Sequence, residues 1–228
     1  MNETTHAVSD TRPGGLIGFN LRLRDFLTVV GHWGSYFILP LIVITIFDVT
    51  IRKLIWIQLW LIDHFGAPFE STTLQELEWH FHTIVFCMVL GYGYVQNRMV
   101  RVDLIRETLA FRKQAWIEFL GVTVFMLPYC IFLVYFGTKF AYDSYTTNEI
   151  SASMVGLGYR WIIKTVFVVG LILAVLSGIA VWLETAILLF GRTTQRFDLM
   201  TLDWPGEEGN RRIGIYDDAA PTDKPPDP

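Results

Sequence analysis

Thr165–Leu183 reads TVFVVGLILAVLSGIAVWL, nineteen residues without an aspartate, glutamate, lysine or arginine. An α-helix rises about 1.5 Å per residue, so about 20 residues cross the ~30 Å hydrocarbon core of a bilayer. Charged residues limit the run on both sides, with Lys164 before it and Glu184 after it. The run therefore predicts a membrane-spanning helix.

Three further runs have the same character. They cover residues 26–47, 79–97 and 119–138, and each lacks the same four charged residue types. The runs are continuously apolar rather than alternating, which disfavours the strands of a membrane barrel. Charged residues make up only 18% of the 228-residue chain, against roughly 25% in ordinary soluble domains. The sequence therefore predicts an all-α integral membrane protein with four transmembrane helices.

Lysine and arginine are unevenly distributed between the two sides of these spans. Thirteen lie before the first span, between the second and third, or after the fourth, and five lie in the other two connections. Because cytoplasmic loops are enriched in these residues, we expect both termini to be cytoplasmic. The formal net charge of −4 offers no excess of positive charge for nucleic acid, so no such partner is expected.

The predicted organisation has three parts. Residues 1–25 form a cytoplasmic N-terminal segment, residues 26–190 form the membrane domain, and residues 191–228 form a cytoplasmic tail. The tail contains eight acidic residues and five prolines, so we expect it to be largely disordered.

A short apolar run, residues 51–62, follows the first span and contains Trp56 and Trp60 one helical turn apart. We expect an interfacial helix on the outer face of the membrane, since tryptophan favours that depth. Packing of this run against a partner protein is the alternative.

Ionisable side chains are scarce inside the predicted spans. The first span contains only His32, the second contains His80 and His82 near its outer end, and the other two contain none. Such groups mark the coupling sites of pumps and transporters, so we do not expect this chain to transport a substrate alone. A haem between His32 and the other two histidines is disfavoured because they lie toward opposite membrane surfaces. Glu78 and His82 lack a third metal ligand, so no catalytic, cofactor or metal site is predicted.

Small residues recur at every fourth position of the last span, at Gly170, Ala174 and Gly178. Such a seam lets a second helix approach closely. The opposing helix belongs either to this chain or to a partner.

Short motifs flank the first two spans. Arg52 follows the first span, and Leu74–His80 (LQELEWH) places Glu76 and Trp79 at the entry to the second. Arg98–Asp103 (RMVRVD) follows the exit of the second span and contains Arg101 and Asp103. In order and spacing, these motifs resemble those of the small membrane subunit of tripartite ATP-independent periplasmic (TRAP) transporters. Met99 stands where that family often has histidine, so no titrating role is expected there.

The resemblance implies a three-part importer in the bacterial inner membrane. In such importers a periplasmic binding protein delivers a small organic anion, and a large membrane subunit carries the substrate and sodium sites. The small subunit is a scaffold rather than an enzyme and has no cofactor. Its partners would be the other two components and membrane lipid.

The same resemblance makes the motif residues structural or subunit-interface residues, namely Arg52, Glu76, Trp79, Arg101 and Asp103. The alternative function is a membrane electron-transfer subunit that binds haem or quinone.

Overall fold

The computed structural model describes residues 15–99, 109–153, 156–190 and 199–202. Within these ranges the chain is helical and contains no strand. The α-helices are α1 (Leu16–Tyr36), α2 (Ile38–Lys53), α3 (Ile55–Phe65), α4 (Ser71–Val95), α5 (Phe111–Gly121), α6 (Leu127–Thr146) and α7 (Trp161–Phe190). A 3₁₀ turn, η1 (Ala67–Phe69), precedes α4, and a π-helical stretch, η3 (Val122–Met126), joins α5 to α6. The all-helical prediction is confirmed for the described residues.

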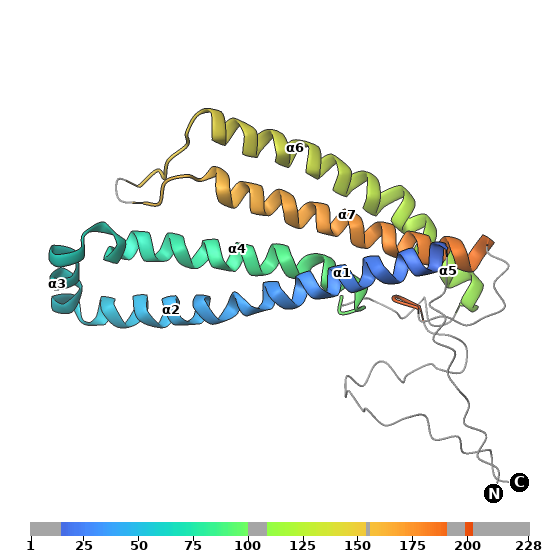
Figure 1. Ribbon diagram of the computed structural model, residues 1–228, viewed down its shortest axis with the longest axis horizontal. Helices are drawn as coiled ribbons and strands as arrows, with labels where there is room; N and C mark the ends of the chain where they lie inside the picture. The colour runs from blue at the N-terminus through green and yellow to red at the C-terminus, as the bar shows by residue number, and fades with distance from the viewer. Residues whose placement is uncertain (1–14, 100–108, 154–155, 191–198, 203–228) are drawn as a thin grey trace, which may run out of the picture.

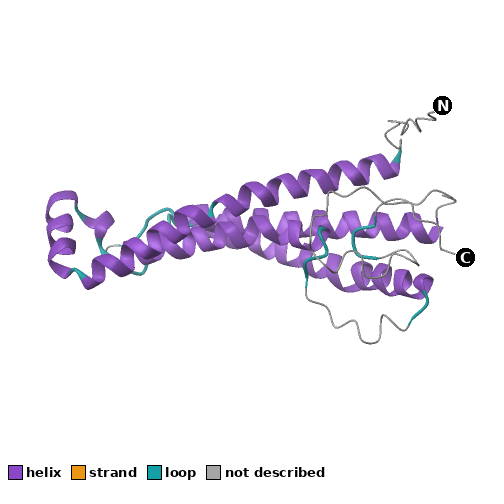
Figure 2. Cartoon of the chain, turned by 90° about the horizontal axis from the view of Figure 1, so that it is seen from below, coloured by secondary structure: helices purple, strands orange, loops and turns teal. Residues whose placement is uncertain are grey.

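The long helices lie side by side in an elongated bundle, and α3 runs across one end of it (Figures 1 and 2). Helix α7 packs against α4, α6 and α1, while α4 also packs against α1 and α2. Thirteen of the thirty residues of α7 are buried, but only Gly137 and Ser144 are buried in α6. The most apolar helix therefore lies inside the bundle, and α6 contacts it along a narrow face.

Three stretches are long and apolar enough to cross a membrane, namely Leu16–Lys53, Phe111–Thr146 and Trp161–Phe190. They contain the first, third and fourth predicted spans. Helix α4, which contains the second, is not among them, because histidine, glutamate, glycine and tyrosine residues interrupt its apolar run. The structure thus supports three of the four predicted spans by length and composition.

The first of these stretches is longer than predicted. It has 38 residues, or about 57 Å of helix, and it begins inside the segment expected to precede the membrane domain. The helix breaks at Phe37, where α1 ends and α2 begins. Pro40 explains the break, because it has no N–H for the carbonyl of Tyr36 and its ring crowds that carbonyl.

The second stretch is interrupted in a similar way. Helices α5 and α6, with η3 between them, together cover 36 residues. Pro128 is the second residue of α6 and cannot donate to the carbonyl of Val124 within η3. The local π geometry absorbs that missing hydrogen bond.

Glycine permits the close crossing of α1 and α4. A β-carbon on Gly31 would lie 2.2 Å from Cβ of Tyr92, and one on Gly34 would lie 2.3 Å from Cβ of Met88. Neither distance is possible for real atoms, so these two positions exclude any side chain. This contact was not predicted from the sequence, although the Gly-x-x-Gly spacing was available as a signal.

Helices α4 and α7 also approach each other closely. A β-carbon on Gly91 would lie 2.8 Å from the carbonyl oxygen of Leu173, and one on Gly170 would lie 2.5 Å from Cβ of Cys87. Ala174, in the middle of the predicted seam, is buried. The Gly170 end of the seam therefore packs against α4 of this chain.

The Gly178 end of the seam meets a different element. A β-carbon there would lie 3.1 Å from Leu127 and 3.3 Å from Met126, at the junction of η3 and α6. The single stripe of small residues thus serves two internal helix contacts.

Residues 199–202 are the described part of the segment expected to be a disordered tail. All four are buried, and Leu199 and Leu202 pack with Ala115 of α5 and Leu189 of α7. The backbone N–H of Met200 donates a 2.7 Å hydrogen bond to Oε1 of the buried Glu184. These four residues belong to the folded bundle, while 191–198 and 203–228 lie outside the described residues.

We expect Gly91→Ala to lower the free energy of unfolding by about 1–3 kcal/mol, because the new methyl group must push α4 away from the α7 backbone. Gly93→Ala is the matched control on the same helix, since its methyl group would lie at an ordinary 3.6 Å from Cε of Met99. Unfolding in detergent, followed by circular dichroism, measures both variants. Equal stability of the two would contradict the close α4–α7 contact.

Candidate functional site

The described candidate residues outside the seam lie at one end of the bundle. There α2 ends, α4 begins and the connection between α6 and α7 folds back (Figure 1). Arg52 is in the last turn of α2, and Glu76 and Trp79 are in the first turns of α4. Arg101 and Asp103 lie outside the described residues.

Arg52 forms part of a polar contact between α2 and α4. It pairs one helical turn away with Asp48, whose side chain is 0% exposed. Asp48 Oδ1 also accepts a 3.3 Å hydrogen bond from Ser71 Oγ. With its amide oxygen toward Arg52, Gln75 accepts hydrogen bonds of 2.9 and 2.7 Å from the guanidinium. Arg52 therefore joins the end of α2 to the start of α4 and compensates a buried carboxylate.

Asp48 was not singled out from the sequence. Its position directly after the first charge-free run and four residues before Arg52 is the signal that could have identified it.

Glu76 forms a second contact, between α4 and the α6–α7 connection. Its side chain points into that connection, and the residue is only 9% exposed. Ser151 Oγ donates a hydrogen bond to Oε1, and the backbone N–H of Leu157 donates one of 2.5 Å to Oε2. A β-carbon on Gly156 would lie 2.2 Å from Ser151 Oγ and 2.7 Å from Glu76 Oε2. The connection thus wraps closely around this carboxylate.

The surroundings of Glu76 favour its ionised form. Burial alone would raise the pKa of the carboxyl group, but the hydrogen bonds from Ser151 and Leu157 and the charges of Arg160 and His80 outweigh it. The net effect holds the pKa of Glu76 below its ordinary value of 4.5. Glu76 is therefore an anion at neutral pH, satisfied by donors of its own chain.

Trp79 and Arg160 extend this cluster. The guanidinium carbon of Arg160 lies 5.7 Å from the centre of the Trp79 ring, in a cation–π contact. Arg160 Nη1 lies 3.9 Å from Glu149 Oε1, and Lys164 pairs with the other oxygen of Glu149. The hydrogen bond from Lys164 is the main cause that lowers the pKa of Glu149. The Trp79 ring therefore contacts a network of charged side chains, and this network holds the start of α7 against α4 and the α6–α7 connection.

The histidines of α1 and α4 are not brought together. His32 contacts Tyr92, whereas His80 hydrogen-bonds to the backbone carbonyl of Glu76. His80 lies twelve residues before Tyr92 on α4, or about 18 Å along the helix. No single haem could join His32 to His80 in this arrangement.

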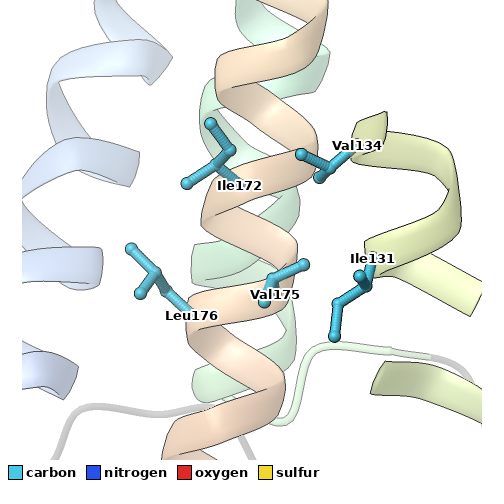
Figure 3. A pocket seen from close by; sticks show the side chains of 5 residues that line it. All are labelled: Ile131, Val134, Ile172, Val175 and Leu176. Atoms are coloured by element: carbon cyan, nitrogen blue, oxygen red, sulfur yellow. The ribbon is translucent and has the colours of Figure 1, made fainter. Parts of the chain in front are cut away.

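The described residues contain no group of side chains arranged as a metal site. They contain no group of three histidine, cysteine, aspartate or glutamate side chains that could hold a metal ion. A shallow groove of about 130 Å³ lies between α6 and α7, and only aliphatic side chains line it (Figure 3). These are Ile131, Val134, Ile172, Val175 and Leu176. The polar cluster is thus arranged to hold helices and loops in register.

We expect Glu76→Gln to lower the free energy of unfolding at neutral pH, because an amide cannot accept both hydrogen bonds as a charged group. Since the folded-state pKa of Glu76 is depressed, its contribution is complete above about pH 4.5 and is lost as the pH falls through the folded-state pKa. The stability of the wild-type protein should therefore decline more steeply in acid than that of the variant. Unfolding in detergent from neutral pH to pH 3 measures this difference.

Asp63→Asn is the control, because the Asp63 side chain is largely exposed on α3. A variant at Glu76 that behaves like this control at every pH would show that the carboxylate contributes nothing to the fold.

Comparison with known proteins bears on the whole bundle. Neither the curated proteins nor the solved structures gave a match to the chain. One family model does match, described as "Tripartite ATP-independent periplasmic transporters, DctQ component", and it covers residues 41–187. That range contains Arg52, Glu76, Trp79 and the seam in α7, and it is well over half of the 228 residues. The chain therefore belongs to the DctQ family and is the small permease component of a TRAP transporter.

Proposed function

We propose that this chain is the scaffold subunit of a sodium-driven importer in the bacterial inner membrane. The imported substrate would be a small organic anion, delivered by a periplasmic binding protein to a large membrane subunit. The observation that carries this proposal is the use of the buried carboxylates Asp48 and Glu76. Both bind donors of their own chain at helix ends, as a rigid brace requires, rather than facing a substrate path.

In this proposal α4 contains the remaining membrane span, the second of the four predicted, over residues 79–97. Its 25 residues give a helix of about 37 Å, which is long enough to cross a bilayer. It packs against α7 on one side and against α1 and α2 on another, so neighbouring helices cover much of its less apolar surface. Lower hydropathy is therefore compatible with a membrane location for this helix.

Helix α3 would lie in the outer membrane interface. None of its eleven residues is buried, and both Trp56 and Trp60 are exposed. The helix runs across the end of the bundle, which would place it parallel to the membrane plane (Figure 1). Tryptophan and aliphatic side chains are suited to the headgroup region.

We expect no transport by this chain alone, because its charge-free runs contain no carboxylate or lysine that could serve as an ion relay. Asp48 and Glu184, which follow two of these runs directly, bind donors of their own chain. Proteoliposomes that contain only the small subunit should show no sodium-dependent uptake of organic acids. Addition of the cognate large subunit and binding protein should produce uptake. Uptake by the small subunit alone would refute the scaffold role.

The excess of lysine and arginine on one side predicts the orientation. Alkaline phosphatase, which is active only outside the cytoplasm, should be active when fused near Thr73 or Thr147. It should be inactive when fused after Arg106. The opposite pattern would reverse the proposed topology.

The interfacial position of α3 is tested separately, by quenching of the fluorescence of Trp60 with brominated lipid.

A further inference from the structure

The outward face of α1 carries polar and aromatic side chains that the bundle does not use. Trp33 is 69% exposed and Tyr36 is 64% exposed, and their rings form an edge-to-face pair with centroids 6.0 Å apart. His32, beside them, is also exposed, and its ring centroid lies 5.3 Å from that of Tyr92 on α4. We call His32, Trp33 and Tyr36 the α1 aromatic face.

Several polar atoms of this face lack partners within the described part of the chain. The only hydrogen-bond contact of the His32 ring there is a distant one, 3.5 Å from Nε2 to the Tyr92 hydroxyl. The Tyr36 hydroxyl and the Trp33 indole N–H have none in the same ranges. Gly31 and Gly34 already bind α1 to α4 through the opposite side of the helix. The α1 aromatic face is therefore a second surface of α1, separate from its internal contact.

The depth of these groups excludes lipid as a good partner. Tyr36 lies ten residues after Phe26, near the middle of the first predicted span, and His32 lies six residues after Phe26, about 9 Å inside. Tyrosine and tryptophan favour the membrane interfaces, and histidine within the hydrocarbon is costly unless another group pairs with it. Acyl chains offer neither donors nor acceptors.

The exposed surface of α2 shows what a lipid-compatible face of this chain looks like. Ile42, Val43 and Ile46 are all exposed there, and all are aliphatic. Tyr129 and Tyr135 on α6 are also exposed phenols, but helix α6 contains no histidine or tryptophan beside them. A histidine and a tryptophan beside the exposed phenol thus distinguish the α1 aromatic face from the surface of α6.

We propose that the α1 aromatic face is the docking surface for the large membrane subunit. The partner would be a transmembrane helix that presents hydrogen-bonding side chains at the depth of His32 and Tyr36. The inference rests on the proposed function. It goes further than the family match, which begins at residue 41 and so does not include this face.

Site-specific photocrosslinking in the assembled transporter tests the proposal. A benzoylphenylalanine at Tyr36 should crosslink to the cognate large subunit, whereas one at Phe132 on α6, which is also exposed, should not. A probe at Tyr36 that reaches only lipid or a second copy of the chain would overturn the inference. Capture of the large subunit from Tyr129 but not from Tyr36 would overturn it as well.

A matched pair of variants tests the role of the polar atoms. His32→Phe keeps an aromatic ring but removes both ring nitrogens, so the affinity for the large subunit should fall about tenfold, as expected for one interhelical hydrogen bond in a membrane. Val124→Phe, at an exposed position of η3, should leave that affinity unchanged. Equal affinities of the two variants would refute the role of His32, provided that both melt like the wild-type subunit.

The two proposals fail in different ways. If the wild-type chain does not bind the large subunit at all, both the scaffold function and the docking surface are wrong. If the wild-type chain binds the large subunit but the probe at Tyr36 gives no crosslink to it, the scaffold function stands and only the docking surface is wrong.

Discussion

The contact between α4 and α7 is the constraint on which the rest of the bundle depends. At Gly91 and Gly170 the two helices lie too close for any β-carbon. In lipid, apolar side chains gain little by leaving one hydrocarbon environment for another, so helix association relies on such close van der Waals contact. Because α7 also supports α6, and α4 also supports α1 and α2, this one contact connects both halves of the bundle.

The polar cluster at the end of the bundle follows from the register that this contact sets. Helix α4 presents Gln75 to the end of α2 and Glu76 to the α6–α7 connection, and these neighbours in sequence point to different partners. Each partner segment contributes compensating groups, Arg52 from α2 and the backbone N–H of Leu157 from the connection. A shift of α4 by one turn would break both contacts at once. The contact of Gln75 with α2 and that of Glu76 with the α6–α7 connection therefore stabilise the same position of α4.

The sequence was sufficient for the helical class and for the family, because charge-free runs and short motifs are local signals. It was insufficient for the helix limits. Charged residues mark where a helix leaves hydrocarbon, but the backbone hydrogen bonds continue past them, as α1 does from Leu16. The partners of Glu76 could not be predicted either, since Ser151 and Leu157 lie 75 and 81 residues away in an irregular connection. Such contacts depend on tertiary structure and leave no periodic pattern in the sequence.

The uneven burial of the helices suggests why a membrane protein of this kind would need a partner. The share of buried residues in the most apolar part of each stretch differs widely. It is 6% in Phe111–Thr146 and 17% in Leu16–Lys53, but 50% in α7. Close packing supplies most of the association energy between helices in lipid, so the outer helices are held weakly by their own chain. The Gly31–Tyr92 and Gly34–Met88 contacts fix one side of α1, and His32, Trp33 and Tyr36 remain on the other. A second membrane subunit that packs on that side would add contacts where α1 has few and would provide partners for polar atoms that lipid cannot bind.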